Sequence, residues 1–423
     1  MLQPAQLDVF WGDTPAGAIH DTAPLTFEYA ASWLAQPQPR AIAVIPLQAG
    51  RIDSAAVQAF FENLLPEGEL RHYIASQKKA STLFSLLLAV AGDTAGGFVI
   101  LPGGKTPAPA RYEATSWQQL AARLGQQTAA ASDIKGRGAR ISLAGAQDKT
   151  SIALFADGVP RLPAGTSPAT HIVKPDIKRL SKVWHSAANE AIIMRTAALC
   201  GLPAAEVFYE PLTRSCVVRR FDRVLRADGK LERLIQYDLC QLAGIVSDKK
   251  YESEGGPGIA ACAELIREHS AQPAVDLRHF AEWIFFNLYT GNNDSHAKNL
   301  SMLEVPGQGL VLAPFYDLMC TRLYPGLAAD FAFAIGGVNG VGGETRPGSV
   351  AREHVAALAG QLRMRPQFVF KLAGDLAARL PAAIEAAVAP LLPALPHGAK
   401  IMAGRLKQFV LSTANKSAAR IRR

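Results

Sequence analysis

Cysteine is scarce in this chain of 423 residues: there are five, their number is odd, and none forms a C-x-x-C pair. Such a set excludes a fully paired disulfide framework and shows no spacing typical of a zinc site. It favours reduced thiols and therefore a cytoplasmic protein. The cysteines are Cys200, Cys216, Cys240, Cys262 and Cys320.

Long apolar runs and targeting signals are also missing. The most apolar stretches, such as residues 83–92, are far shorter than the ~20 residues that a membrane-spanning helix needs. The start of the chain, MLQPAQLDVFWG, has neither the basic region nor the long apolar region of a signal peptide. The sequence therefore predicts a soluble intracellular protein without a membrane partner.

The composition is that of a globular protein, with 49% hydrophobic and 19% charged residues. The length predicts two or three domains with sizeable cores. The formal net charge of +8 favours anionic partners such as nucleotides or nucleic acid without choosing among them. An ordinary basic protein with no polyanionic partner fits the charge equally well.

Changes in pattern along the chain predict three segments: a small α+β subdomain over 1–105, a strand-rich lobe over 106–235, and a mainly helical lobe over 236–423. Apolar periodicity and turn residues add local predictions. These are a hairpin over 7–20, a strand at 41–47, a helix over 57–76 broken at Pro66, and C-terminal helices divided at Pro381 and at 389–396.

The stretch GNNDSHAKNLS at 291–301 follows a predicted apolar helix. Asp294 and Asn299 have the D-x-x-x-x-N spacing of the protein-kinase catalytic loop, in which the aspartate accepts a hydroxyl proton and the asparagine holds Mg²⁺. Lys298 would neutralise charge on the transferred phosphoryl group, and His296 would contact the nucleotide or orient the loop. Taken alone, the spacing also fits a polar loop after a helix C-cap.

Asp317, in LAPFYD, follows Asn299 across a predicted hairpin. A strand pair that returns to the loop would bring this carboxylate beside the amide, where the two would chelate one Mg²⁺ between phosphates. The order of base, amide ligand and carboxylate is that of kinases. A carboxylate that caps a turn at a strand end is the alternative.

The stretch ISLAGAQDK at 141–149 predicts a phosphate-binding turn between two strands. Small residues around Gly145 let backbone N–H groups approach an anion, and Lys149 adds positive charge. The stretch matches no complete phosphate-loop motif, and a simple hairpin turn fits it as well. Ser142 is a candidate regulatory phosphoacceptor.

Lys174 ends the apolar strand of THIVKP and would reach the α- and β-phosphates if Glu190 on the next predicted helix oriented it. A surface lysine before Pro175 is the alternative. VVRRFD at 217–222 lies where the strand-rich segment passes to the helical one, which is the position of a kinase hinge. Phe221 would pack near adenine there, or form ordinary core. Together these motifs give the ordered parts of a phosphoryl-transfer site.

The same motifs resemble the HipA family of serine/threonine-protein kinase toxins from bacterial type II toxin–antitoxin modules. The likeness rests on SLAGAQDK, THIVKP, RRFDR, YDLCQLAG, KYESEGGPG, NNDSHAKN and APFYD, and FFENLLPEG and TLFSLLLAVAGDTAGGFVILP resemble the family's N-terminal subdomain. It implies an α+β, two-lobed protein-kinase-like fold with a sheet-rich N-lobe, an added N-terminal subdomain and a mainly helical C-lobe.

The resemblance also implies a role for each matching residue. Asp294 and Lys298 are the catalytic residues, Asn299 and Asp317 bind Mg²⁺, and Ser142 is autophosphorylated, which switches the enzyme off. The implied ATP contacts are Ala144, Gly145, Ala146, Gln147, Asp148, Lys149, Lys174, Glu190, Arg219, Arg220, Phe221, His296, Asn299 and Tyr316. Arg219 departs from the pattern, since an acidic residue is expected before Arg-Phe.

The implied function is that of a non-specific serine/threonine protein kinase that uses ATP and Mg²⁺. Its implied target is a protein, notably an aminoacyl-tRNA synthetase, whose phosphorylation inhibits translation and promotes growth arrest or persistence. The implied partners are a HipB-like helix-turn-helix antitoxin and, through it, operator DNA. The Gly-rich loop at 250–258 borders the protein-substrate site or is a mobile surface loop.

Two other functions stay open on the sequence. A catalytically silent relative that serves as antitoxin partner and DNA-bound corepressor fits the basic C-terminus NKSAARIRR. A metal-dependent phosphoesterase would use His296, Asp294 and Asp317 as metal ligands but would leave Lys174 and Glu190 without a role.

Overall fold

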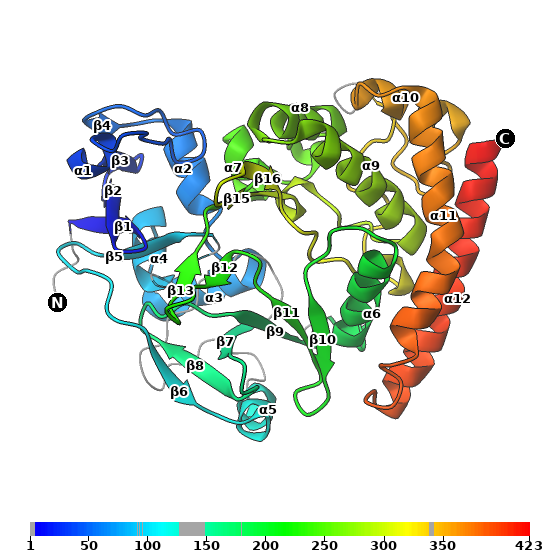
Figure 1. The fold of residues 1–423 in the computed structure, drawn as a ribbon, viewed down its shortest axis with the longest axis horizontal. Helices are drawn as coiled ribbons and strands as arrows, with labels where there is room; N and C mark the ends of the chain where they lie inside the picture. Colours follow the sequence, from blue (N-terminus) through cyan, green and yellow to red (C-terminus); the bar gives the residue numbers. More distant parts are fainter. Residues whose placement is uncertain are drawn as a thin grey trace. The chain divides into compact units, whose positions relative to one another are not determined.

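The computed structural model of the chain describes residues 5–90, 92, 94, 96–126, 149–178, 180–337 and 342–423. The chain divides into two compact units, Met1–Val173 with Arg220–Asp248 and Lys174–Arg219 with Lys249–Arg423. Each unit is therefore assembled from two stretches that are far apart in the sequence (Figure 1).

The first unit begins with a five-stranded antiparallel sheet in the order β4-β3-β2-β1-β5. Its strands are β1 (Gln6–Trp11), β2 (Thr14–His20), β3 (Thr26–Tyr29), β4 (Arg51–Ile52) and β5 (Phe98–Pro102), and its helices are α1 (Ala31–Leu34), α2 (Ala55–Glu62), α3 (Gly68–Lys78) and α4 (Leu83–Val90). The predicted hairpin is confirmed by the β1–β2 pairing, and the predicted break at Pro66 falls between α2 and α3.

The strand predicted at 41–47 is wrong, because no strand forms there. Ile42 and Ile45 are buried, as an apolar strand would be, but one side chain satisfies their backbone groups. The Tyr29 hydroxyl accepts from the Ile42 N–H at 2.8 Å and donates to the Ile45 carbonyl at 3.1 Å. The alternation of apolar residues therefore reports burial here without a β-ladder.

The rest of the first unit is strand-rich and carries the short helix α5 (Trp117–Gln126). Strand β8 pairs with both β6 and β7, and β7 pairs with the first residues of β9. The elements are β6 (Arg111–Ala114), β7 (Thr150–Leu154), β8 (Pro160–Ala164), β9 (His171–Pro175), β12 (Arg223–Leu225), β13 (Leu231–Arg233), β14 (Gln236–Asp238) and α7 (Leu239–Ala243). The last residues of β9, which include Lys174, belong to the second unit.

The second unit is mainly helical and is built around α9 (Pro273–Thr290), against which α8, α11 and α12 pack (Figure 1). Its helices and strands are α6 (Ser186–Leu199), β10 (Val207–Glu210), β11 (Ser215–Arg219), α8 (Ile259–His269), β15 (Ser301–Val305), β16 (Gly309–Leu312), α10 (Arg352–Gln361), α11 (Pro366–Val388) and α12 (His397–Arg422). Short 3₁₀ turns complete it, namely η3 (Glu252–Glu254), η4 (Ala297–Asn299) and η5 (Thr321–Leu323), while η2 (Ser247–Lys249) lies at the unit boundary.

Every residue of α9 from Phe280 to Thr290 is buried, which marks it as the core helix of this unit. Its fully buried aromatic side chains include Phe280, Trp283 and Phe286. The helix ends at Gly291, whose φ of +74° is left-handed and whose Cβ, if present, would lie 2.7 Å from the Phe409 ring. Glycine is therefore needed to stop the core helix and begin the polar loop at this place.

The predicted division of the C-terminal helices at Pro381 is wrong, because Pro381 lies inside α11. A proline inside a helix removes one backbone hydrogen bond. Here the buried face continues across it through Leu376, Leu380 and Ile384, so tertiary packing outweighs that loss. The other predicted division is confirmed, since the segment 389–396 separates α11 from α12.

Candidate active site

A buried lysine joins two carboxylates at the end of β9. Lys174 is 5% exposed, and its Nζ lies 2.6 Å from Glu190 Oε1 on α6 and also pairs with Asp317 Oδ1. Burial alone would lower the pKa of Lys174, but the charges of Asp317 and Glu190 outweigh it and raise the pKa above its ordinary value. The side chain is therefore a fixed ammonium group, and the surface-lysine alternative is excluded by its burial.

The hairpin β15–β16 returns the chain to the polar loop, as predicted. Two contacts of Tyr316 fix the return: its hydroxyl donates to the Lys298 carbonyl at 2.9 Å and lies 2.7 Å from Ser301 Oγ. The next residue, Asp317, has a φ of +55°, which aspartate tolerates better than most residues. The hairpin thus holds Tyr316, the residue before Asp317, against the loop that carries Lys298.

The side-chain amides of the loop hold its backbone in place. Asn299 Nδ2 donates to the Asp294 carbonyl at 2.8 Å, and Asn292 Oδ1 accepts from the Asp294 N–H at 3.3 Å. Asn293 donates from its backbone N–H to Thr321 Oγ1 at 2.8 Å. Asp294 itself is exposed, so the amides present its carboxylate to solvent on a fixed turn.

His296 is buried in the same loop and is 5% exposed. Burial lowers its pKa well below the ordinary value, the positive charges of Lys250 and Lys298 lower it further, and Asp317 opposes them. The imidazole is therefore neutral at physiological pH. Its Nδ1 has no hydrogen-bond partner among the described residues.

An amide on α6 ties this helix to the segment that follows Asp317. Asn189 Oδ1 accepts from the Cys320 N–H at 2.9 Å, and its Nδ2 donates to the Cys320 carbonyl at 3.0 Å and to the Tyr324 hydroxyl at 3.0 Å. Because Asn189 precedes Glu190 in the helix, the clamp fixes Glu190 relative to Asp317. Sequence reasoning missed this residue, because a helix-interior asparagine carries no signal of its partner.

Tyr251 was also missed as a site residue. Its hydroxyl donates to Asp294 Oδ1 at 2.5 Å, and its ring meets the His296 ring edge-on at a centroid distance of 5.0 Å. The only signal in the sequence was its place in the Gly-rich loop 250–258, for which a position beside the protein-substrate site was one of two predictions.

The predicted hinge residues have different surroundings. In the second unit Arg219 is exposed and pairs with Glu206 at 2.8 Å. In the first unit Arg220 is buried and bound to Asp222 through Nε at 3.0 Å and Nη2 at 2.8 Å. Phe221, between them, is partly exposed. The Arg220 guanidinium is therefore occupied by a buried ion pair with Asp222.

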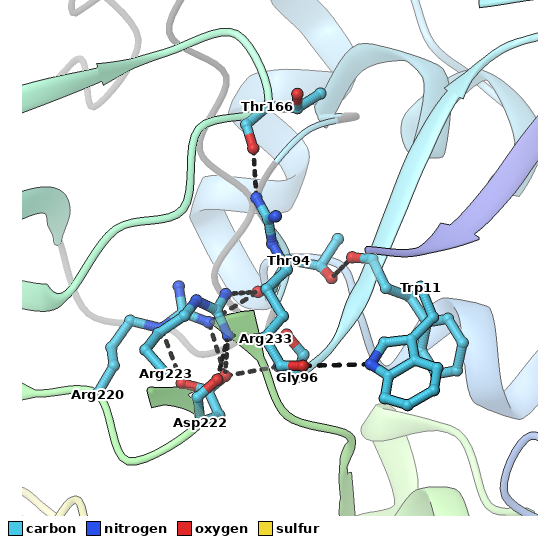
Figure 2. A network of polar contacts seen from close by, with 9 residues as sticks. Trp11, Thr94, Gly96, Thr166, Arg220, Asp222, Arg223 and Arg233 are labelled. Atoms are coloured by element: carbon cyan, nitrogen blue, oxygen red, sulfur yellow. Dashed lines mark hydrogen bonds and ion pairs between the residues drawn. The ribbon is translucent and has the colours of Figure 1, made fainter. Parts of the chain in front are cut away.

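Figure 2 shows the network that holds this segment within the first unit. Asp222 Oδ2 accepts from the Gly96 N–H at 2.9 Å and pairs with Arg223 at 2.9 Å. Arg220 and Arg223 both donate to the Thr94 carbonyl, at 2.8 and 3.2 Å. The buried charges of residues 220–223 are thus compensated within the segment itself and by the loop that precedes β5.

The predicted phosphate turn lies largely outside the described residues. Ser142 and the five residues Ala144, Gly145, Ala146, Gln147 and Asp148 lie in the stretch 127–148, outside the described residues. Lys149 is described and is half-buried immediately before β7. The turn and the phosphoacceptor therefore remain predictions.

The donors of the site suit a magnesium ion. Asp317 offers a carboxylate whose side chain is 39% exposed, and Asn299 offers an amide oxygen in the same unit. Mg²⁺ is held by one or two protein oxygens together with phosphates and water, so a larger protein cage is not required. Among the described residues no group of three or more His, Cys, Asp or Glu is placed to hold a metal by itself.

Comparison with known proteins assigns the family. The profile of the HipA N-terminal domain matches residues 7–101, and that of the HipA-like C-terminal domain matches residues 141–384, which is more than half of the chain. The chain therefore belongs to the HipA family, and the resemblance predicted from its motifs is confirmed.

Individual relatives agree over most of their length. Y4mE of Sinorhizobium fredii is 35% identical over an alignment of 348 residues, and the match covers 78% of this chain and 80% of Y4mE. The serine/threonine-protein kinase toxin HipA of Shewanella oneidensis is 29% identical over an alignment of 402 residues, and the match covers 91% of this chain and 89% of that toxin.

A solved structure gives the same fold. HipA of Shewanella oneidensis MR-1, in a complex with HipB and operator DNA, matches with a TM-score of 0.83 and 25% identity over 98% of both chains. The predicted α+β, kinase-like fold class is thereby confirmed. In the part of this chain that the structure describes, no helix has the length and apolar character to span a membrane.

Proposed function

We propose that this chain is an ATP- and Mg²⁺-dependent serine/threonine protein kinase and the toxin of a HipBA-type toxin–antitoxin module. Membership of the HipA family supports the proposal, as does the 29% identical relative named as a kinase toxin. The observation that carries it is the buried Lys174, paired with Glu190 and Asp317. A phosphoryl-transfer site needs this set: a cation for the phosphates, a carboxylate that orients it, and a carboxylate for the metal.

In the proposed mechanism Lys174 binds the α- and β-phosphates of ATP. Its raised pKa keeps it charged over the whole physiological range, and Glu190 at 2.6 Å holds the ammonium in position. Pre-placed charge of this kind costs no reorganisation during the reaction. The hydrogen bonds between the Asn189 side chain and the Cys320 backbone hold Glu190 in position relative to Asp317.

Asn299 and Asp317 would hold Mg²⁺, which neutralises negative charge on the transferred phosphoryl group when bound. Lys298, buried in the same loop, adds a positive charge there. His296, whose lowered pKa keeps it neutral, would line the site without adding a charge. Both residues would contact the nucleotide, together with Tyr316.

Asp294 is the proposed general base. Its carboxylate is exposed while the loop backbone beneath it is fixed by Asn292 and Asn299. A base must reach the hydroxyl of a protein acceptor and also keep its position, and this arrangement meets both needs. The proton of the acceptor hydroxyl passes to Asp294 as the hydroxyl oxygen attacks the γ-phosphorus.

The remaining parts of the proposal follow the family resemblance. The turn from Ala144 to Lys149 would bind phosphates, the backbone of Arg219–Phe221 would bind adenine, and autophosphorylation of Ser142 would switch the enzyme off. The proposed target is a protein, with an aminoacyl-tRNA synthetase as the first candidate, and its modification would inhibit translation and promote growth arrest or persistence.

The proposed partners are a HipB-like antitoxin and, through it, operator DNA. The solved relative was captured with HipB and its operator, and this chain matches 98% of it. The proposed compartment is the cytoplasm, where all five cysteines, which are buried and unpaired with each other, would stay reduced.

The test is transfer from ATP radiolabelled in its γ-phosphate, with Mg²⁺, to proteins of a bacterial lysate. The wild-type chain should label at least one lysate protein, which mass spectrometry identifies with its modified residue. Asp294→Asn should reduce labelling by about 10²–10⁴-fold, the usual cost of losing a positioned base.

A matched control is Asp375→Asn, the same chemical change at an exposed ion pair with Lys371 on α11. It should leave labelling unchanged. Equal labelling by the wild type and Asp294→Asn would refute the kinase proposal, and ATP binding without any labelled protein would point to the silent corepressor instead.

A further inference from the structure

One hydroxyl of the chain already lies on the proposed base. The Tyr251 hydroxyl donates to Asp294 Oδ1 at 2.5 Å. A general base makes this contact with the hydroxyl that it deprotonates, at a heavy-atom distance of about 2.6–3.2 Å. Tyr251 therefore occupies the place on Asp294 that an acceptor hydroxyl, or a water molecule, would take.

The aromatic ring of Tyr251 is held independently of this hydrogen bond. It meets the buried His296 ring at an interplanar angle of 89°, and Lys250 Nζ lies 5.4 Å from its centroid. Edge-on aromatic contacts and cation–π contacts both stabilise a fixed ring position. Removal of the hydroxyl alone would thus leave the ring in place and open a site of about one oxygen atom beside Asp294.

The loop that carries Tyr251 is a tightly built turn. The Tyr251 carbonyl accepts from the Gly256 N–H at 2.9 Å, and a Cβ on Gly256 would come within 2.2 Å of the Lys249 carbonyl oxygen. Glu252 Oε2 accepts from the Ala334 N–H at 2.7 Å. A Cβ on Gly258 would meet Glu252 Oε1 at 2.3 Å. The glycines of KYESEGGPG therefore serve to close this turn and aim Tyr251 at the base.

We propose that Tyr251 is a specificity-determining residue: its hydroxyl blocks water from the acceptor position on Asp294 and yields only to the hydroxyl of a bound protein. The inference rests on the proposed kinase function. An exposed base next to ATP would otherwise activate water, and the nucleotide would be hydrolysed without use.

The suppressed reaction is ordinary hydrolysis. The oxygen of water forms a bond to the γ-phosphorus, the bond from this phosphorus to the β–γ bridging oxygen breaks, and ADP leaves. One proton of the water passes to Asp294, and inorganic phosphate is released. With the Tyr251 hydroxyl on Oδ1, water cannot occupy the same position. A protein acceptor bound over the loop gains enough contact energy to displace one hydrogen bond.

The experiment measures inorganic phosphate released from ATP and Mg²⁺ by the purified full chain without any added protein acceptor. Tyr251→Phe keeps the ring and removes the hydroxyl, and we expect phosphate release to rise roughly tenfold, because one hydrogen bond to a charged group no longer competes with water. The double variant Tyr251→Phe with Asp294→Asn should lose this gain. A gain of activity cannot result from poor folding.

Tyr289→Phe is the matched control. It removes a buried hydroxyl that donates to the Ala373 carbonyl at 3.1 Å, between α9 and α11, and should not raise phosphate release. Unchanged or lower release by Tyr251→Phe would overturn the inference, as would phosphate found on Tyr251 itself. If Asp294→Asn alone keeps full transfer to lysate proteins, the kinase proposal fails and the inference with it. If Asp294→Asn is inactive while Tyr251→Phe gives no gain, only the inference fails.

Discussion

Asp222 is followed by Arg223 and Asp294 lies between Asn293 and Ser295, yet the surroundings of the two carboxylates in the structure are opposite. Asp222, in the first unit, is 3% exposed and bound to Arg220, Arg223 and the Gly96 N–H (Figure 2). Asp294, in the second unit, is exposed, and the amides around it bind its backbone.

The two environments distinguish a carboxylate that stabilises the fold from a carboxylate that is accessible to a substrate. A buried carboxylate between two guanidinium groups is costly to disturb and has no access to substrate. An exposed carboxylate on a fixed backbone loses little solvation and keeps its reactivity. We therefore expect substitutions in the motif RRFDR to affect mainly the stability of this chain, and substitutions in NNDSHAKN to affect mainly its activity.

The largest expected effect is on activity alone. Asp294→Asn should reduce phosphoryl transfer by about 10²–10⁴-fold. Because the side chain is exposed, the free energy of unfolding should change by less than about 0.5 kcal/mol. Transfer of labelled phosphate measures the activity, and urea denaturation of the same preparation measures the stability. A large loss of stability would contradict the prediction that Asp294 affects activity alone.

The second effect is on stability alone. Asp222→Ala leaves two buried guanidinium groups without their carboxylate and should lower the free energy of unfolding by about 3–5 kcal/mol. Arg219→Ala, which breaks the neighbouring exposed pair with Glu206, should cost no more than about 1 kcal/mol. Denaturant titration measures the free energy of unfolding of both variants. Equal losses in the two would contradict the prediction.

The third variant affects both properties. Asn189→Ala removes the partners of the Cys320 N–H, the Cys320 carbonyl and the Tyr324 hydroxyl, all of which are buried. Unsatisfied groups of this kind predict a loss of about 2–4 kcal/mol. Because the clamp also holds Glu190, transfer by the fraction that remains folded should fall as well. Normal turnover per folded molecule, with folding followed by circular dichroism, would show that the clamp is structural only.

The smallest effect is on the pH dependence of stability. His296 has a lowered pKa in the folded chain, so at pH values below about 6.5 the unfolded state binds a proton that the folded state does not. Its contribution is therefore complete above this pH and is lost as the pH falls, by at most about 1.4 kcal/mol per pH unit. His296→Asn should flatten this slope in nucleotide-free, magnesium-free protein. An identical slope in thermal melts from pH 7 to pH 5 would show that other groups cause it.

Much of the candidate site was predictable because its parts follow local rules. Gly291 ends an apolar helix, and the β15–β16 hairpin follows from alternation around a turn. The pairing of Lys174 with Glu190 followed from a kinase-like order of motifs. The first two of these signals lie within a short window of sequence, and the third uses the order of motifs along the chain.

The parts that were not predictable depend on contacts between distant segments. Tyr251 reaches Asp294 only because Gly256 and Gly258 close a turn by close approach, which the sequence shows merely as a glycine-rich loop. The strand expected at 41–47 is replaced by hydrogen bonds to Tyr29. Pro381 remains helical because buried neighbours support it.

The left-handed backbone at Asp317, with a φ of +55°, restricts which residues can replace it. Glycine and asparagine accept that conformation with little strain, whereas most other side chains do not. Both would preserve the course of the chain and delete the carboxylate. A relative that carries glycine or asparagine at this position should therefore remain well folded but, if Asp317 holds the metal as proposed, lose phosphoryl transfer.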